Sequence, residues 1–209
     1  MEQVDILLPP TFKKSGIVKS RKEAIEDGDW IGTFNLWILQ TDPVPAIVYQ
    51  QRSPNSTWAP NKLDVSAGGH YQAGETMLDG LREVREELGR TYAEENLTYM
   101  GKKLFVGPNI RGVMLHNVVD IFFTIDNSPI ESFLLEKNEV FAVVTCPLDD
   151  LINAHSSDHS FQAQGITNQK ASVSITVDAD AFPYNWDNYH YKIAQLAKRF
   201  ISGEKDLVY

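Results

Sequence analysis

A short acidic helix preceded by glycines constrains this chain more than any other stretch. Residues 69–75 read GHYQAGE, and residues 82–89 read REVREELG. Glu83, Glu86 and Glu87 are spaced i, i+3 and i+4, so on a helix their side chains share one face. Carboxylate oxygens are the ligands that hard divalent cations prefer. The pattern therefore predicts a carboxylate cluster suited to Mg²⁺ and to the phosphates that Mg²⁺ accompanies.

The limits of this helix are also visible in the sequence. Thr76 is suited to the N-cap, with Asp79 as its capping-box partner, and Gly89 stands where a helix ends. An apolar stripe is predicted on the opposite face, formed by Met77, Leu81, Val84 and Leu88. Spacing alone also fits a solvated acidic face whose charge is offset by neighbouring arginines, so it leaves both interpretations open.

The same stretch resembles the Nudix box, whose pattern is G-x5-E-x7-R-E-U-x-E-E-x-G-U, with U an aliphatic residue. The matching positions are Gly69, Glu75, Arg82, Glu83, Val84, Glu86, Glu87 and Gly89. Two positions depart from the pattern: six residues instead of seven separate Glu75 from Arg82, and Arg90 takes the last aliphatic position. Deleting one residue inside a helix would rotate its start by about 100°. We therefore expect the loop or the first turn to absorb the missing residue.

Segments around the box extend the resemblance from about residue 15 to about residue 155. They resemble the Nudix branch related to isopentenyl diphosphate isomerase, at residues 20–24, 28–30, 34–38, 49–53 and 62–70. The resemblance implies an α/β (α+β) fold, namely a Nudix-type α/β/α sandwich with a mixed β-sheet and the Nudix loop and helix. It also implies Mg²⁺-dependent cleavage of a pyrophosphate bond in a nucleoside diphosphate derivative or a related small phosphorylated substrate, with Mn²⁺ as an alternative ion.

The resemblance implies metal-binding and catalytic roles for residues of the box. The metal ligands are Glu83, Glu86 and Glu87, with a backbone carbonyl at Gly69 or its neighbour Gly68. Arg82 orients these glutamates and pairs with Glu75. Glu83, Glu86 and Arg82 are therefore the candidate catalytic residues of the box.

The general base is harder to assign. One interpretation gives this role to a glutamate of the box. The other follows the resemblance to a later acidic residue, for which Glu139 is the first candidate and Glu136 the second. An exposed loop carboxylate is the alternative for both residues.

Other residues are weaker candidates for substrate contact. His70 and Arg52 are candidates for phosphate, against structural roles in a loop and a salt bridge. Trp58 is a candidate for stacking on a ring, although such aromatic residues, Trp37 included, more often pack in cores or loops. His155 and His159 have the spacing of a metal pair but lie in a polar stretch, which favours a solvated loop.

The composition of the chain limits the kinds of binding partner and the cellular compartment that we expect. A net charge of −9 argues against general nucleic-acid binding, which needs a basic surface. The single cysteine, Cys146, lies in an apolar run and is predicted to be a buried thiol, which is consistent with a reducing cytoplasm. No signal peptide and no membrane-length apolar run is recognisable. A homodimer, common among Nudix proteins, is the default expectation.

The chain is predicted to form one Nudix domain with two additions. Residues 1–25 are an N-terminal lead-in packed on the domain, 26–155 the Nudix hydrolase domain, and 156–209 a C-terminal extension with a terminal helix. The predicted helices are 21–26, 77–88, one starting at 147–154, and 189–202. The predicted strands are 33–40, 46–51, 63–67, 97–106, 114–125, 140–145 and 171–177, with a polar loop at 155–169.

Two other functions stay open. A Nudix fold that has lost catalysis would act as a module that binds a nucleotide or a partner. An isopentenyl diphosphate isomerase is disfavoured, because the isomerases that this branch resembles use a cysteine just before the box, and residues 65–70 contain none.

Overall fold

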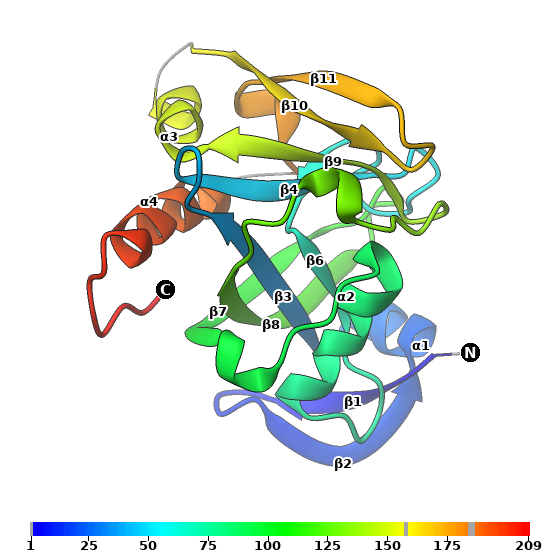
Figure 1. Ribbon diagram of the computed structural model, residues 1–209. Helices are drawn as coiled ribbons and strands as arrows, with labels where there is room; N and C mark the ends of the chain where they lie inside the picture. Colours follow the sequence, from blue (N-terminus) through cyan, green and yellow to red (C-terminus); the bar gives the residue numbers. More distant parts are fainter. Residues whose placement is uncertain (1, 157–158, 184–186) are drawn as a thin grey trace.

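The computed structural model describes residues 2–156, 159–183 and 187–209 (Figure 1). The strands are β1 (Gln3–Leu8), β2 (Lys13–Ser20), β3 (Trp30–Gln40), β4 (Ala46–Arg52), β5 (Leu63–Asp64), β6 (Ala67–His70), β7 (Thr98–Pro108), β8 (Met114–Ile125), β9 (Val140–Pro147), β10 (Phe161–Thr167) and β11 (Ser172–Val177). The α-helices are α1 (Arg21–Glu26), α2 (Leu81–Leu88), α3 (Leu148–Ser156) and α4 (Tyr189–Ile201). Short 3₁₀ turns are η1 (Met77–Gly80), η2 (Glu94–Asn96), η3 (Ile130–Ser132) and η4 (Ala179–Ala181).

A mixed sheet connects all the described strands. Its main path runs β11-β10-β9-β4-β3-β1-β2, while β8 pairs with β3 and carries β7 on its other side. The β3–β8 pair is parallel, and the other pairs are antiparallel. The short strands β5 and β6 pair with β4 and β3, respectively.

Strand β3 is buried on both faces, which explains its nearly continuous apolar sequence. Phe34 and Leu36 belong to an apolar cluster that includes Val84 of α2. Trp37 and Leu39, which point to the opposite face, belong to a second cluster with residues of α3 and α4. Alternate side chains of one strand thus face different helices. The predicted α/β/α sandwich with a mixed sheet is confirmed.

Two parts of the sheet were missed by the sequence interpretation. The lead-in forms the hairpin β1–β2, and β1 also pairs with β3. The predicted polar loop at 155–169 contains β10, which pairs with β9 and β11. Polar residues such as Gln162 and Gln164 occupy the exposed face of β10, so its composition resembles that of a loop. Residues 157 and 158 of this stretch lie outside the described residues.

The start of the predicted helix 77–88 is also different. Residues Met77–Gly80 form a 3₁₀ turn, and α2 begins only at Leu81. Met77 is therefore 42% exposed and does not join the apolar stripe. The prediction that Met77 belongs to this stripe was wrong. The tighter first turn agrees with the expectation that the start of the helix absorbs the missing residue.

Arg90, which replaces an aliphatic residue of the pattern, makes a cation–π contact through its guanidinium. Its guanidinium lies 4.9 Å from the ring centroid of Phe133. It also pairs with Asp126 at 2.5 Å, and Tyr92 donates a hydrogen bond to the same carboxylate at 2.7 Å. These contacts anchor the chain just beyond the end of α2.

No helix among the described residues is both long enough and apolar enough to cross a membrane.

Candidate active site

The acidic helix α2 ends at the glycine expected from its sequence, while the expected cap at Thr76 belongs to the 3₁₀ turn η1 that precedes the helix. The backbone N–H of Thr76 donates to the carboxylate of Asp79 at 2.7 Å. Gly89 has φ +63°, in the left-handed region that favours glycine, and its N–H bonds to the carbonyl of Arg85. The helix is therefore set as a rigid unit against the sheet.

The three glutamates of α2 differ in exposure. The side chain of Glu86 is 52% exposed, that of Glu83 is 13% exposed, and Glu87 is buried with the apolar stripe. The expectation that all three lie on the solvated side was therefore wrong for Glu87. The carboxylates instead form an arc that passes from solvent into the protein.

Arg82 joins the carboxylates of this region. Its guanidinium pairs with Glu75 at 3.1 Å, with Glu83 at 3.0 Å and with Glu86 at 3.0 Å. The expected Arg82–Glu75 ion pair is therefore present despite the shortened spacing. One cation holds three anionic groups in fixed relative positions.

Close backbone approach brings the two more buried glutamates against β6. A Cβ atom at Gly69 would lie 2.3 Å from the carboxyl carbon of Glu83, so only glycine leaves room for this carboxylate. Glu87 accepts a hydrogen bond from the N–H of Gly68 at 3.0 Å. Burial raises the pKa of Glu83 to about 7, against the opposing effect of Arg82. Burial also raises the pKa of Glu87 well above its ordinary value, and the charges of Glu83 and Glu139 add to this.

Glu139 joins this group of carboxylates from another segment of the chain. It lines the same pocket as Glu83 and Glu87, and its backbone carbonyl accepts a hydrogen bond from Ser53. Glu136, the second candidate for the base, instead accepts hydrogen bonds from the backbone N–H groups of Asn138 and Glu139. The structure thus places Glu139 at the pocket and gives Glu136 a role in shaping the turn.

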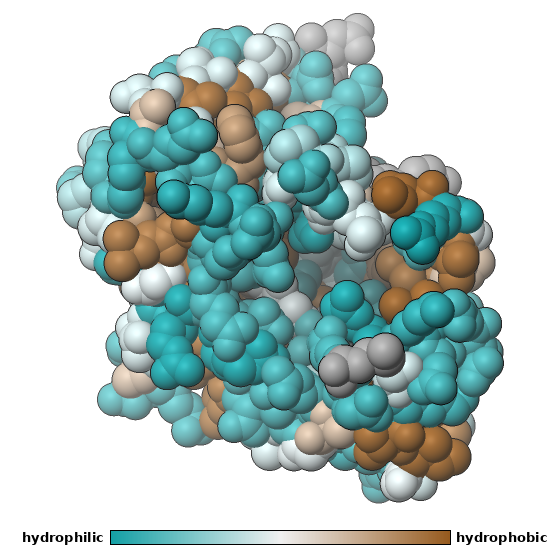
Figure 2. Space-filling model, turned by 90° about the vertical axis from the view of Figure 1, so that its right-hand side faces the viewer, coloured by the Kyte–Doolittle hydropathy of each residue, from teal (hydrophilic) through white to brown (hydrophobic). Residues whose placement is uncertain are grey.

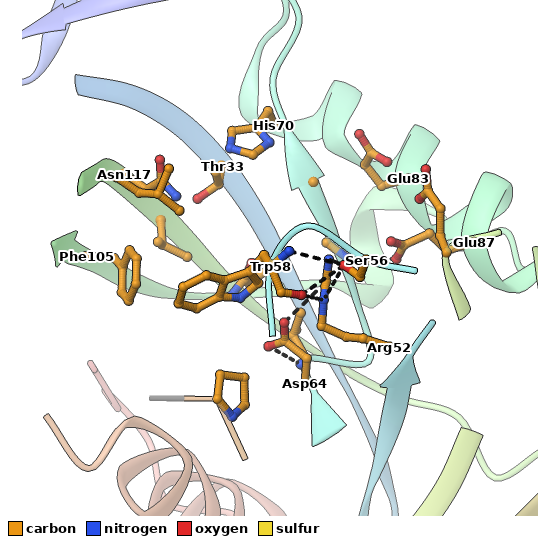
Figure 3. Close-up of a pocket in the computed structure, with 18 of the residues that line it drawn as sticks. Thr33, Arg52, Ser56, Trp58, Asp64, His70, Glu83, Glu87, Phe105 and Asn117 are labelled. Carbon is orange, nitrogen blue, oxygen red and sulfur yellow. Dashed lines mark hydrogen bonds and ion pairs between the residues drawn. The ribbon is translucent and has the colours of Figure 1, made fainter. Parts of the chain in front are cut away.

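A pocket of about 620 Å³ connects these carboxylates with a group of aromatic and amide side chains. We name the two ends by their residues. The carboxylate end consists of Glu83, Glu86, Glu87 and Glu139, and the aromatic end of Trp58, Phe105, Thr33 and Asn117. Figure 3 shows Glu83 and Glu87 on one side of the view, Phe105 and Asn117 on the other, and His70 and Trp58 between them. The face turned toward the viewer in Figure 2 is hollowed near its centre, among mostly hydrophilic residues.

Strand register assembles the floor of the pocket. Residues paired across neighbouring strands point to the same face of a sheet. One row across β7, β8, β3 and β6 consists of Lys103, Val119, Thr33 and His70, and the next row pairs Phe105 with Asn117. The sequence interpretation missed Phe105 and Thr33. Their only signal was this register, which depends on strand pairs far apart in the chain.

Arg52 holds the loop that carries Trp58. It donates to the carbonyl of Trp58 and to the hydroxyl of Ser56, both at 2.8 Å, and pairs with Asp64 at 3.3 Å. The Trp58 ring then meets Phe105 edge-on, with 5.3 Å between ring centroids. Arg52 therefore makes the salt bridge considered as its alternative role, while it also lines the pocket.

His70 is a neutral side chain in the pocket wall. Burial lowers its pKa to about 3, and the charges of Arg21 and Arg52 act in the same direction. Its Nδ1 lies 3.3 Å from the guanidinium of Arg21, which can only donate, so Nδ1 accepts and Nε2 carries the proton. Nε2 is buried and has no hydrogen-bond partner among the described residues, so its N–H group is unpaired in the pocket wall.

The remaining candidates lie elsewhere. His155 bonds to the carbonyl of Leu151 at 2.8 Å, and His159 lies 3.7 Å from Asp150, so the two histidines do not form a metal pair. Trp37 and Cys146 are fully buried in the core.

The carboxylate end suits a divalent cation in its chemistry. Glu87 is a fully buried acid whose polar contacts are the N–H of Gly68 and, at 3.5 Å, the amide of Gln50. No ion pair within the described part of the chain involves Glu87, and a buried carboxylate without a counter-charge is costly. Across the described ranges, no three His, Cys, Asp or Glu side chains already converge as a metal site. In this arrangement Glu83 and Glu86 each form an ion pair with Arg82.

Comparison with known proteins shows which family has this combination of glycine loop, acidic helix and sheet. A family model, the NUDIX domain, matches residues 33–168. The chain belongs to the Nudix hydrolase family. It is accordingly a pyrophosphohydrolase, and Nudix hydrolases generally need divalent metal ions.

Two curated relatives are Nudix hydrolases by name. The uncharacterized Nudix hydrolase CA_C0446 of Clostridium acetobutylicum is 30% identical over 87% of this chain and 81% of its own length. Nudix hydrolase 3 of Arabidopsis thaliana is 31% identical over 75% of this chain, but this match covers only 21% of that longer protein. The isomerase-like branch stays a prediction.

Solved Nudix structures share the fold. DR0079 of Deinococcus radiodurans superposes with a TM-score of 0.59 at 17% identity, covering 95% of this chain and 98% of that one. The MutT protein of Methanosarcina mazei Go1 gives a TM-score of 0.54 at 16% identity, covering 82% and 94% of the two chains. At these identities the likeness concerns the fold alone.

Proposed function

We propose that this Nudix enzyme hydrolyses a pyrophosphate bond in a nucleoside diphosphate derivative or a related small phosphorylated molecule, with Mg²⁺ or Mn²⁺ at the carboxylate end. The observation that carries the proposal is the continuous pocket, which joins buried carboxylates to aromatic and amide side chains. A diphosphate would lie at the first end and a ring-bearing group at the second.

The residues suited to hold the metal are Glu83, Glu86 and Glu87, with the backbone carbonyl of Gly69. Once bound, the ion would neutralise charge on the phosphates and lower the pKa of a coordinated water. Arg82 would keep the glutamates in place through its three ion pairs. The unpaired N–H of His70 is a candidate donor to a phosphate oxygen, and Trp58 is a candidate to contact the ring.

Glu139 is our candidate for the general base. It is exposed, and it lines the same pocket as Glu83 and Glu87 from another segment of the chain. Its backbone is fixed by Ser53 and Glu136, which restricts the positions that its carboxylate can reach. A base held in this way can take a proton from an attacking water without itself needing to bind the metal.

The alternative of a catalytically inactive binding module draws on two observations: Glu83 and Glu86 are each paired with Arg82, and no metal-ligand group of three is preformed among the described residues. Nothing in the pocket favours the isomerase, because Cys146 is buried and does not line it. A reducing, cytoplasmic compartment agrees with this free thiol. The homodimer stays a prediction.

Product analysis by anion-exchange chromatography tests the proposal. Nucleotide sugars, dinucleoside polyphosphates, dNTPs and prenyl diphosphates are incubated with Mg²⁺ and wild type, Glu86→Gln or the exposed control Glu94→Gln. We expect cleavage of at least one nucleotide by wild type and Glu94→Gln, and loss of that cleavage in Glu86→Gln. Absence of cleavage throughout, with the metal still bound, would favour the binding module. Equal activity of all three proteins would exclude Glu86 from the site.

A further inference from the structure

The N-terminal hairpin β1–β2 lies outside the residues matched by the family model, yet it contacts the turn that precedes α2. Figure 1 shows the hairpin at the bottom of the molecule, beside this turn. Three consecutive residues of the turn are held by hydrogen bonds, each at 2.8 Å. The N–H of Ala73 donates to the Gln3 carbonyl, the N–H of Gly74 donates to the Asp5 carboxylate, and the Lys14 ammonium donates to the Glu75 carbonyl.

The same turn is connected to the carboxylate end. One oxygen of the Glu75 carboxylate pairs with Arg82 at 3.1 Å, and the other accepts from the N–H of Gln72 at 2.7 Å. Arg82 in turn pairs with Glu83 and Glu86. A continuous series of polar contacts therefore runs from the hairpin to the carboxylates.

The hairpin contacts lie just before residues 76–81, the segment that is one residue shorter than the Nudix pattern. Gly74 adopts φ +88°, and open space surrounds the position of a Cβ atom there, so packing does not hold this residue in place. Hydrogen bonds from the hairpin supply the constraint instead. Asp5 and Lys14 also pair with each other at 2.7 Å, and only 16% of the Asp5 side chain is exposed.

We propose that the N-terminal hairpin is a positioning element of the active site, in which Asp5 and Lys14 hold residues 73–75 so that Glu75 orients Arg82 and the metal-binding glutamates. The inference rests on the proposed function in one respect, namely that these glutamates bind a divalent ion. A hairpin that only stabilises the fold would affect unfolding without affecting the metal site.

Metal binding by the full chain, measured without substrate, distinguishes these cases. Mn²⁺ is titrated by electron paramagnetic resonance into wild type, Asp5→Ala, Lys14→Met and the matched control Lys13→Met, an exposed neighbour on β2. We expect Asp5→Ala and Lys14→Met to weaken Mn²⁺ binding roughly three- to tenfold. Loss of a group that hydrogen-bonds directly to a metal ligand typically weakens binding by about 10- to 100-fold, and Asp5 and Lys14 are further from the metal ligands. Lys13→Met should bind as wild type does, and Lys14→Arg should restore much of the affinity.

A double-mutant cycle tests whether the effect passes through Glu75. Glu75→Gln and Lys14→Met are measured separately and together. If Lys14 acts by positioning Glu75, the double variant should bind little worse than Glu75→Gln alone. Additive losses, or affinities in Asp5→Ala and Lys14→Met equal to wild type, would overturn the inference.

Failure of the proposed function can be distinguished from failure of the hairpin proposal. If wild type binds no Mn²⁺, the metal-dependent function fails, and hydrogen exchange decides the structural part. Faster amide exchange at residues 72–76 in Lys14→Met, but not in Lys13→Met, would support the hairpin as a positioning element. Unchanged exchange would overturn it.

Discussion

The two ends of the pocket are built in different ways. The carboxylate end comes largely from one helix, where Glu83, Glu86 and Glu87 lie within five consecutive residues. The aromatic end combines a loop after β4 with strands β3, β7 and β8. One end carries negative charge that suits a metal and phosphates, and the other carries rings and amides. Chemistry and selectivity should therefore be separable by substitution.

The largest effect is expected at the carboxylate end. Glu87→Gln should lower kcat by about 100-fold or more, because it removes a charged ligand rather than a group that merely orients one. Calorimetry of the metal-free protein should show an unchanged or higher Tm, since glutamine is a neutral isostere that never carries a buried charge and still accepts from Gly68. A much lower Tm would mean that Glu87 serves folding rather than metal binding.

Glu139→Gln tests whether general-base catalysis and metal binding belong to different carboxylates of the carboxylate end. We expect kcat to fall by about 10²-fold or more, as for loss of a general base, while Mn²⁺ affinity changes less than in Glu87→Gln. Steady-state kinetics and Mn²⁺ titration measure the two effects. A wild-type kcat would transfer the role of base to a box glutamate.

At the aromatic end the expected effect is smaller and falls on binding. Trp58→Leu should raise KM roughly tenfold for a substrate with a ring, with little change in kcat, since stacking on an aromatic side chain contributes ~1–3 kcal/mol per base. Phe141→Leu, an exposed phenylalanine outside the pocket, is the control. Equal KM values for wild type and Trp58→Leu would contradict the division between the two ends.

The smallest expected effect concerns pH and metal removal. Because the pKa of Glu83 is raised to about 7 and that of Glu87 is raised as well, the folded metal-free protein binds protons more tightly than the unfolded chain. The resulting stability is fully present below the ordinary pKa of 4.5 and is lost as pH rises through about 7.

Thermal unfolding should therefore show that Tm of the metal-free protein falls by a few degrees from pH 5 to pH 8. Added Mg²⁺ should raise Tm more at pH 8 than at pH 5, because it binds deprotonated carboxylates. A double variant, Glu83→Gln with Glu87→Gln, should show a weaker pH dependence. A Tm that rises with pH in the metal-free wild type would oppose this account of the carboxylate end.

Prediction from sequence succeeded where structure is local. Capping at Thr76 and Gly89 and the i, i+3, i+4 spacing of the glutamates depend on neighbours within a few residues. The same logic failed for Met77, because a 3₁₀ turn changes the periodicity, and for β10, because its exposed face is polar. The exposure of each glutamate also depends on how α2 rests on β6, which spacing does not specify.

By itself the sequence determined the family, the acidic helix and the residues suited to hold a metal, because these features follow from short-range spacing and side-chain chemistry. Only the tertiary structure decided that Phe105, Thr33 and Asn117 line one pocket with Trp58, since strand register brings the three strand residues together from distant segments. It also decided that Asp5 and Lys14 hold the turn before α2. Contacts between residues more than sixty positions apart arise from folding of the whole sheet, and no local pattern records them.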